Sequence, residues 1–235
     1  MRGKGGTKRA PRTFSPSLAG ACLRYATMDR LRFGRQIDQA SRAAMQEGGR
    51  RHRRFQAELV QGGDLIAVEQ VIKDDALGVS GRMDAVRWFN GRPQVIEFKT
   101  VDGERFAWIR QHGPLVAHVA QLALYLALTR YEQGVLVVES RASDEHLEFV
   151  VSRHQEWENW LLARIRLSEE AAREHRLPAR EVSLNCLSCD RWQRCFTDQA
   201  AREAAVAEHP GWEPEPPLPG GSGDAIEAMG QGRIS

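Results

Sequence analysis

Hydrophobic residues recur along the chain with two different periods, which predict strands in its middle and helices around them. Runs rich in β-branched and aromatic residues predict strands over residues 64–73, 79–89, 93–101, 135–139 and 146–151. Apolar residues at helical spacing predict helices over about residues 15–33, 36–60, 114–132 and 154–175, and a short Ala-rich helix follows residue 195. This order of elements favours an α/β fold in which helices flank a mixed sheet.

Glycines refine the pattern at two places. Asn90-Gly91 predicts a two-residue hairpin turn between the second and third strands, because both residues tolerate the positive φ of a type I′ turn. Gly48-Gly49 is expected to interrupt the second helix, since glycine lowers helix stability.

The two ends of the chain differ in composition from its middle. Residues 1–13 predict a flexible basic arm, and residues 209–235 are so rich in Pro and Gly that they predict a disordered tail. Residues 14–208 form the predicted domain. No apolar run reaches the roughly 18 residues of a membrane helix, and no secretory signal follows the basic start, so we expect a cytoplasmic protein without a membrane partner.

Charge is distributed unevenly, although the formal net charge is only +2. Residues 1–54 contain 14 Lys and Arg against 3 Asp and Glu, whereas the remainder contains 19 against 28. The clustered arginines of residues 50–54 suit the phosphates of a nucleic acid. A solvated basic helix face explains the same charge equally well.

The predicted hairpin gathers two carboxylates and an ammonium group. If Asn90-Gly91 is a two-residue turn, the numbers of directly paired residues add to 181, so Asp84 is expected opposite Glu97. Lys99 lies two residues after Glu97 on the same strand and therefore shares its face of the sheet. A divalent cation such as Mg²⁺ or Mn²⁺ would relieve the repulsion between the carboxylates. A cross-strand salt bridge is the more frequent explanation of such a pattern taken alone. With 4 Lys and 29 Arg in the chain, Lys99 is notable as a compact point charge.

Three polar residues flank the hairpin in the sequence. His52 follows Gly48 at G-x3-H spacing, while Gln121 and Tyr125 are four residues apart and therefore share one helix face. Taken alone, His52 is more often an ordinary surface or satisfied histidine, and a polar helix edge over the sheet explains Gln121 and Tyr125 at least as well as a functional site does.

The four cysteines indicate a metal or cluster site. Cys186, Cys189 and Cys195 form a C-x2-C-x5-C run, and Cys22 lies far upstream. In a reducing compartment such a run favours ligation over disulfides. From the spacing alone, a structural zinc ion and an iron-sulfur cluster remain equally open.

Taken in order, these motifs resemble the iron-sulfur branch of the PD-(D/E)xK nucleases. They are most similar to the CRISPR-associated protein four family, small relatives of RecB-type and AddB-type nuclease domains. The ordered motifs, which cover about residues 15–196, are Cys22, G-x3-His52, Gly81-Arg-Met-Asp84, Glu97-Phe-Lys99, Gln121-x3-Tyr125 and Cys186-x2-Cys189-x5-Cys195. Met83 departs from the proline of the superfamily name, and Leu23 from a proline found in many relatives, but neither departure affects a ligand.

The resemblance implies a restriction-endonuclease-like fold and roles for individual residues. His52, Asp84, Glu97 and the backbone carbonyl of Phe98 would hold Mg²⁺ or Mn²⁺, and Lys99 would act on the attacking water and the phosphate. Gln121 and Tyr125 would support the site and the DNA backbone. A [4Fe-4S] cluster bound by Cys22, Cys186, Cys189 and Cys195 would join the N- and C-terminal segments.

The function that the resemblance implies is a metal-dependent DNA exonuclease acting on single-stranded ends or overhangs. In CRISPR adaptation it would trim prespacers and select for the protospacer-adjacent motif beside the CRISPR integrase complex. A catalytically silent iron-sulfur module that binds DNA for an adaptation or repair complex is the alternative. A zinc-stabilised RNA-processing nuclease is a third reading.

Overall fold

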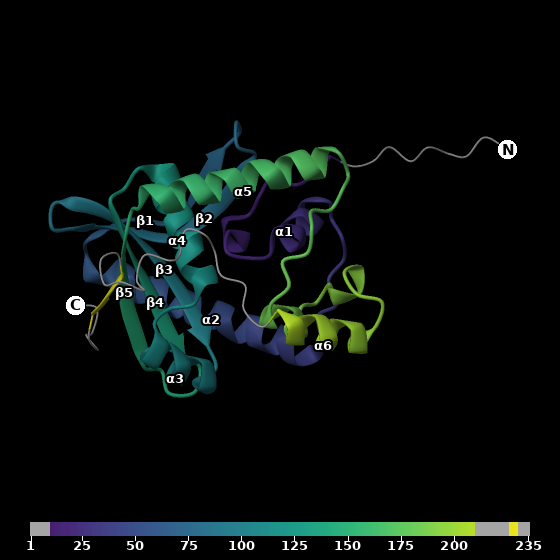
Figure 1. The fold of residues 1–235 in the computed structure, drawn as a ribbon. Coiled ribbons are helices and arrows are strands. Elements are labelled where there is room, and N and C mark those ends of the chain that lie inside the picture. Colours follow the sequence, from purple (N-terminus) through teal and green to yellow (C-terminus); the bar gives the residue numbers. More distant parts are fainter. Residues whose placement is uncertain (1–9, 210–225, 230–235) are drawn as a thin grey trace.

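The computed structural model describes residues 10–209 and 226–229 (Figure 1). The α-helices within these ranges are α1 (Leu23–Arg30), α2 (Gln39–Gly62), α3 (Gly103–His112), α4 (Val116–Thr129), α5 (Gln155–Arg173) and α6 (Gln199–Glu208). The strands are β1 (Leu65–Asp74), β2 (Val79–Phe89), β3 (Arg92–Val101), β4 (Gln133–Ser140), β5 (His146–Ser152) and β6 (Ile226–Met229). Short 3-10 helices are η1 (Pro16–Leu18), η2 (Leu184–Ser188) and η3 (Trp192–Arg194).

The strands form one mixed sheet in sequence order, β1-β2-β3-β4-β5-β6. Among the described strands, β3 and β4 pair in parallel and the other neighbours are antiparallel. Parallel neighbours need a crossover connection. Here α3 and α4 provide it, which brings α4 against the sheet next to the hairpin.

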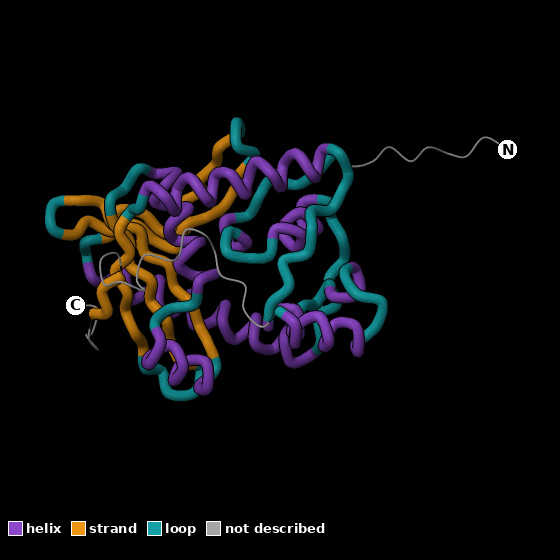
Figure 2. Tube along the Cα trace, viewed as in Figure 1, coloured by secondary structure: helices purple, strands orange, loops and turns teal. Residues whose placement is uncertain are grey.

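Helices cover both faces of the sheet (Figure 2). On one face, Phe55 and Leu59 of α2 pack against Phe98 of β3. On the other face, Leu122 and Leu126 of α4 belong to the largest apolar cluster, and α5 packs on the far side of α4. The expected α/β sandwich of helices around a mixed sheet is therefore confirmed.

Segments from the two ends of the domain lie side by side away from the sheet (Figure 1). The Glu181 carboxylate accepts a hydrogen bond from the backbone N–H of Leu23 at 2.6 Å and pairs with Arg164 at 2.6 Å. Arg191, which is almost fully buried, pairs with Asp29 of α1 at 2.9 Å. These contacts attach the cysteine segment to the N-terminal helix.

The helices differ from the sequence prediction in three respects. The helix expected over residues 15–33 is divided into η1 and α1, and between them Gly20 lies so close to α4 that a Cβ would be 2.5 Å from the Cα of Ala117. The expected interruption at Gly48-Gly49 is wrong, since α2 runs continuously through both residues. Helix α3, capped by Asp102, has no counterpart in the prediction.

The hairpin prediction is confirmed. Paired residues of β2 and β3, such as Ala85 with Ile96 and Phe89 with Arg92, have numbers that add to 181. Asn90 and Gly91 both have positive φ, at 49° and 76°. The turn chemistry therefore sets the register that positions the carboxylates.

Parts of the predicted arm and tail lie outside the described residues, namely 1–9, 210–225 and 230–235. At the edge of the arm, the backbone N–H of Arg12 donates to the carbonyl of Arg30 at 2.8 Å. Within the predicted tail of residues 209–235, Ile226–Met229 forms β6 and pairs with β5. Among the described helices, none has the length and apolar character needed to cross a bilayer.

Candidate active site

Asp84 and Glu97 occupy the point where β2 and β3 separate. The regular pairing ends at Ala85 and Ile96, one position before the two carboxylates. Beyond it, Oδ2 of Asp84 accepts a hydrogen bond from the backbone N–H of Phe98 at 2.8 Å. The Asp84 carboxylate thus takes the place of a backbone carbonyl as the acceptor for Phe98 and lies between the two strands. Its other oxygen, Oδ1, remains free to bind another group.

His52 of α2 meets that second oxygen. Its Nε2 lies 2.9 Å from Oδ1 of Asp84, and this hydrogen bond raises the pKa of the imidazole. Gly48 allows the approach, because a Cβ there would lie 3.1 Å from Oγ1 of Thr100 on β3. The helix therefore passes close to the strand, and His52, one turn later, reaches the sheet.

Glu69 of β1 joins this pair and was not predicted from the sequence. One ligand atom from each of His52, Glu69 and Asp84 lies within 4.8 Å of the others. Its backbone has a φ of 53°, which is unusual for a residue other than glycine and a conformation found often at functional sites. Gln56 donates to Oε1 of Glu69 at 2.6 Å, and Arg82 pairs with Oε2 at 2.5 Å.

Glu97 lies beside Lys99 rather than in that three-residue group. Its side chain is 1% exposed, and Oε1 lies 2.6 Å from Nζ of Lys99. Burial raises the pKa of Glu97 to about 7, with Lys99 opposing the rise and Asp84 adding to it. Within the described residues, Oε2 of Glu97 is buried and has no hydrogen-bond partner. A buried, unpartnered carboxylate oxygen is a costly feature that a bound cation would resolve.

Gln121 and Tyr125 of α4 form a polar chain that begins at Lys99. The ammonium of Lys99 donates to Oε1 of Gln121 at 2.9 Å, and Nε2 of Gln121 lies 3.4 Å from the hydroxyl of Tyr125. That hydroxyl donates to the carbonyl of Arg82 at 2.8 Å. Gly81 makes room for it, since a Cβ there would meet the Tyr125 oxygen at 3.3 Å and Pro16 at 2.6 Å.

Several of these side chains, but not Glu97 or Lys99, line a cavity of about 410 Å³ that is open to solvent. Its polar lining includes His52, Arg53, Glu69, Asp84, Gln121 and Tyr125. Two hydroxyl side chains, Ser15 and Ser17, complete it from the N-terminal segment. The structure thus brings together residues from η1, α2, β1, β2 and α4.

His118 lies one turn before Gln121 on α4 and is partly buried. Burial, together with the charges of Lys99 and Arg105, lowers the pKa of its imidazole to about 3. Its Nδ1 has no hydrogen-bond partner among the described residues. The imidazole is therefore neutral in the folded protein at physiological pH.

We expect His118→Gln to make the protein less sensitive to acid. Above pH 6.5 the histidine is neutral in both states, whereas between pH 6.5 and about pH 3 the unfolded chain binds a proton that the folded chain excludes. The wild-type protein therefore loses stability as the pH is lowered through this window, by an amount on the order of 1.4 kcal/mol per pH unit from this group. Urea unfolding of the wild type and the variant, on either side of pH 6.5, measures this loss. An equal loss of stability in the variant would show that His118 does not contribute.

The four cysteines line a second cavity, of about 480 Å³, between α1, the start of α2 and the cysteine segment. All four are free and partly exposed. Burial raises the pKa of the Cys22 and Cys189 thiols. The expected convergence of one upstream cysteine with three downstream ones is found, although Cys22 and Cys186 are 164 positions apart.

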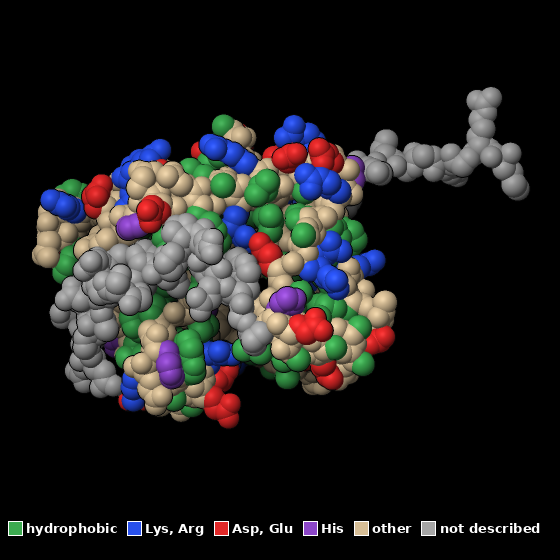
Figure 3. Space-filling model, in the orientation of Figure 1, with side chains coloured by type: hydrophobic (Ala, Val, Ile, Leu, Met, Phe, Trp, Pro, Cys, Tyr) green, Lys and Arg blue, Asp and Glu red, His purple; other side chains and the backbone are tan. Residues whose placement is uncertain are grey.

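The surface charge is mixed. On the face seen in Figure 3, Lys and Arg side chains are interspersed with Asp and Glu. The excess of basic residues in the first part of the sequence is therefore partly compensated in space by acidic residues from the second part, as in the pairs of Arg51 with Glu139 and Arg35 with Asp190.

Comparison with known proteins places the chain in a class. The family model described as the PD-(D/E)XK nuclease superfamily matches residues 9–196. The chain belongs to this superfamily. That match covers the hairpin, α2, α4 and the cysteine segment, and so includes every residue of the two cavities named above.

Solved structures with the same fold are similar at low identity. The protein SSO0001 is 19% identical with a TM-score of 0.51, over 81% of this chain and 89% of that chain. LHK-Exo in complex with dAMP is 17% identical with a TM-score of 0.50, over 69% and 87% of the two chains. Another structure of LHK-Exo, an alkaline exonuclease from Laribacter hongkongensis, is 15% identical with a TM-score of 0.50 and has the same coverage of both chains. No curated protein matches the chain.

Proposed function

We propose that this nuclease is a divalent-metal-dependent DNA exonuclease that acts on single-stranded ends or overhangs. The observation that carries the proposal is the open cavity at the end of the β2-β3 hairpin, which is lined by His52, Glu69 and Asp84, with the pair of Glu97 and Lys99 on the adjoining strand β3. The exonuclease LHK-Exo, which has the same fold and was crystallised with dAMP, is compatible with this activity.

The donor set fits Mg²⁺ or Mn²⁺. Carboxylate oxygens and an imidazole nitrogen are ligands that these ions accept, and the unpartnered Oε2 of Glu97 supplies a further oxygen. We assign the ion to His52, Asp84, Glu97 and the carbonyl of Phe98, with Glu69 at the same site. When bound, such an ion lowers the pKa of a coordinated water and polarises a phosphoryl oxygen.

Lys99 is assigned to the reacting phosphate. Its ammonium is fixed between Oε1 of Glu97 and Oε1 of Gln121, and these bonds leave a third N–H for substrate or water. A positive charge held in place before reaction stabilises the negative charge that develops on the phosphate without reorganisation. Gln121, in turn steadied by Tyr125, positions Lys99.

We assign a [4Fe-4S] cluster to Cys22, Cys186, Cys189 and Cys195. Four free thiols around one cavity satisfy the ligand number of such a cluster, and zinc would use the same four. The order of the motifs, with one cysteine before the nuclease core and three after it, supports the cluster.

We further propose a place in CRISPR adaptation, where the enzyme trims prespacers and selects for the protospacer-adjacent motif beside the integrase complex. Support for this role comes from the ordered set of six motifs rather than from any single contact.

Degradation of end-labelled single-stranded DNA, duplex DNA and RNA in Mn²⁺, with and without chelator, tests the activity. We expect Mn²⁺-dependent shortening of the single-stranded DNA from an end. DNA binding without any cleavage would instead support a silent DNA-binding module. Cleavage restricted to RNA would support an RNA-processing nuclease.

A further inference from the structure

Helix α2 carries four arginines between residues 50 and 54, and the structure divides them between two faces. Residues 47, 51, 54 and 58 share one face at helical spacing, and residues 49, 52, 53 and 56 share another. Gly49, His52, Arg53 and Gln56 all line the cavity of the candidate active site. Arg53 is thus the member of the arginine run that belongs to the site.

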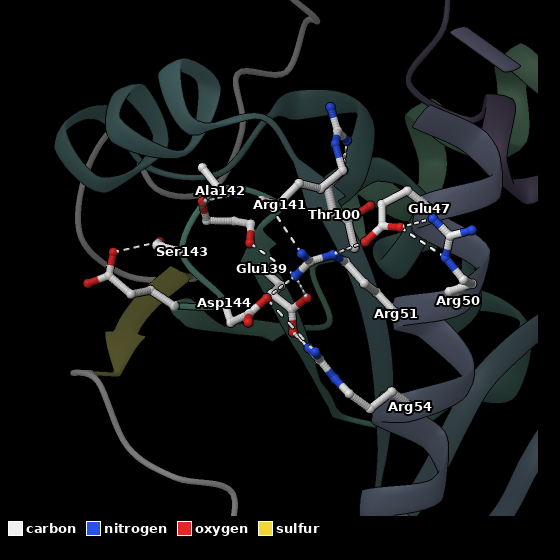
Figure 4. A network of polar contacts seen from close by, with 12 residues as sticks. Glu47, Arg50, Arg51, Arg54, Thr100, Glu139, Arg141, Ala142, Ser143 and Asp144 are labelled. Carbon is white, nitrogen blue, oxygen red and sulfur yellow. Dashed lines mark hydrogen bonds and ion pairs between the residues drawn. The ribbon is translucent and has the colours of Figure 1, made fainter. Parts of the chain in front are cut away.

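Arg51 and Arg54 on the first face are bound to β4 and the following turn (Figure 4). Arg51 pairs with the buried carboxylate of Glu139 at 2.8 Å, and Arg54 pairs with its other oxygen at 2.5 Å. Asp144 also contacts Arg51. These two arginines hold α2 to the sheet, so their charge is compensated within the fold.

Arg50 is compensated locally. Its Nε donates to Oε2 of Glu47 at 3.0 Å, three residues earlier on the helix, and the Arg50 side chain itself is exposed. Arg53 differs from all three neighbours, because its exposed guanidinium has no ion pair or hydrogen bond among residues 10–209.

The other charges that line the cavity are paired. Asp84 is matched by His52 and Glu69 by Arg82, while Glu97 and Lys99, which pair with each other, do not line it. Among the described residues that line the cavity, Arg53 therefore remains as the cation in excess. Two carboxylates, Glu69 and Asp84, line the cavity, and a cation beside them offsets their repulsion of an approaching phosphodiester.

We propose that Arg53 binds a backbone phosphate of the DNA strand, next to the phosphate that is cleaved. The guanidinium presents paired N–H donors that match two oxygens of one phosphate. Ser15 and Ser17, whose hydroxyl oxygens lie 2.9 Å apart on the N-terminal segment, line the same cavity and add neutral donors. The inference rests on the proposed nuclease function, and it names the residue that positions the substrate strand.

Arg53→Ala and its matched control Arg50→Ala test the proposal by DNA binding. In a Lys99→Ala background without metal, we expect Arg53→Ala to weaken binding of a single-stranded oligonucleotide about tenfold at low salt. The slope of log K against log salt should fall by about 0.7, which is the value for one phosphate of a single strand. Arg50→Ala, whose partner Glu47 retains Arg51, should match the background protein.

Cleavage measured in the wild-type background separates this proposal from the nuclease function. Arg53→Ala should raise KM with a smaller effect on kcat. Arg53→Lys, which keeps the charge but loses the paired donors, should recover only part of the affinity. Thermal stability should not change because the side chain is exposed. An unchanged affinity and salt slope in Arg53→Ala would overturn the proposal even if the wild type cleaves DNA. A wild type that does not cleave would overturn the nuclease function, while the binding result would still decide the role of Arg53.

Discussion

Replacing Asp84 by asparagine is expected to abolish Mn²⁺ binding at the hairpin and to slow DNA cleavage by roughly 100-fold or more, as loss of a direct ligand should. The substitution removes the negative charge that faces His52 at 2.9 Å. The amide oxygen can still accept the hydrogen bond from the backbone N–H of Phe98. The separation of the two strands should therefore persist, and the loss should be specific to metal binding and activity.

Isothermal titration with Mn²⁺ and cleavage of an end-labelled oligonucleotide measure the two effects of Asp84→Asn together. Asp75→Asn is the matched control, because Asp75 is an exposed carboxylate in the turn after β1, paired with Lys73 at 2.7 Å and absent from the cavity lining. It should behave as the wild type. Retention of Mn²⁺ binding and full activity by Asp84→Asn would exclude Asp84 as a ligand.

Under the proposed cluster assignment, replacing Cys189 by serine is expected to remove the iron and to destabilise the cysteine segment. A cluster that links Cys22 to Cys186 closes a loop of 164 positions. The corresponding chain entropy is on the order of 5 kcal/mol. The pairs of Glu181 with Arg164 and of Arg191 with Asp29 remain, so we expect the segment to loosen before the sheet unfolds.

Metal analysis and visible absorption of anaerobically purified Cys189→Ser, together with its thermal unfolding, test this expectation. Ser188→Ala, one position earlier on the same loop, controls for a general effect of substitution there. Zinc in place of iron in the wild type would refute the cluster and retain the four-thiolate site. An unaltered metal content and unfolding temperature in Cys189→Ser would refute both.

The hairpin could be predicted because the residues of its turn determine the pairing of the two strands. Asn90-Gly91 permits one type of two-residue turn, which fixes the register from Phe89 and Arg92 inward to Ala85 and Ile96. Placing Asp84 and Glu97 at the same end of the hairpin required no knowledge of the rest of the fold.

Glu69 could not be predicted in the same way. The connection between Asp74 and Val79 has four residues and defines no unique register, so the residue of β1 that faces Asp84 is known only from the folded sheet. The positive φ of Glu69 is likewise imposed by tertiary structure. In the sequence, this glutamate stands in an ordinary alternating strand pattern.

Helix α2 shows how tertiary contacts override local preference. Glycine disfavours a helix, yet Gly48 is needed where α2 passes Thr100, and the ion pairs of Arg51 and Arg54 with Glu139 fasten the helix beyond it. The arginine run was interpreted either as a phosphate-binding cluster or as a solvated face. Neither interpretation holds for Arg51 and Arg54, because they bind acidic residues that are distant in the sequence.

Cleavage of end-labelled single-stranded DNA in Mn²⁺ by the anaerobically purified wild type and by Lys99→Ala tests the nuclease assignment most directly. Lys99 contacts Glu97 and Gln121, both of which belong to the candidate site, so its replacement acts on the site itself. We expect the wild type to shorten the DNA and Lys99→Ala to be about 10²- to 10³-fold slower while still binding it. Binding by both proteins without cleavage by either, or equal cleavage by both, would contradict a nuclease site on this hairpin.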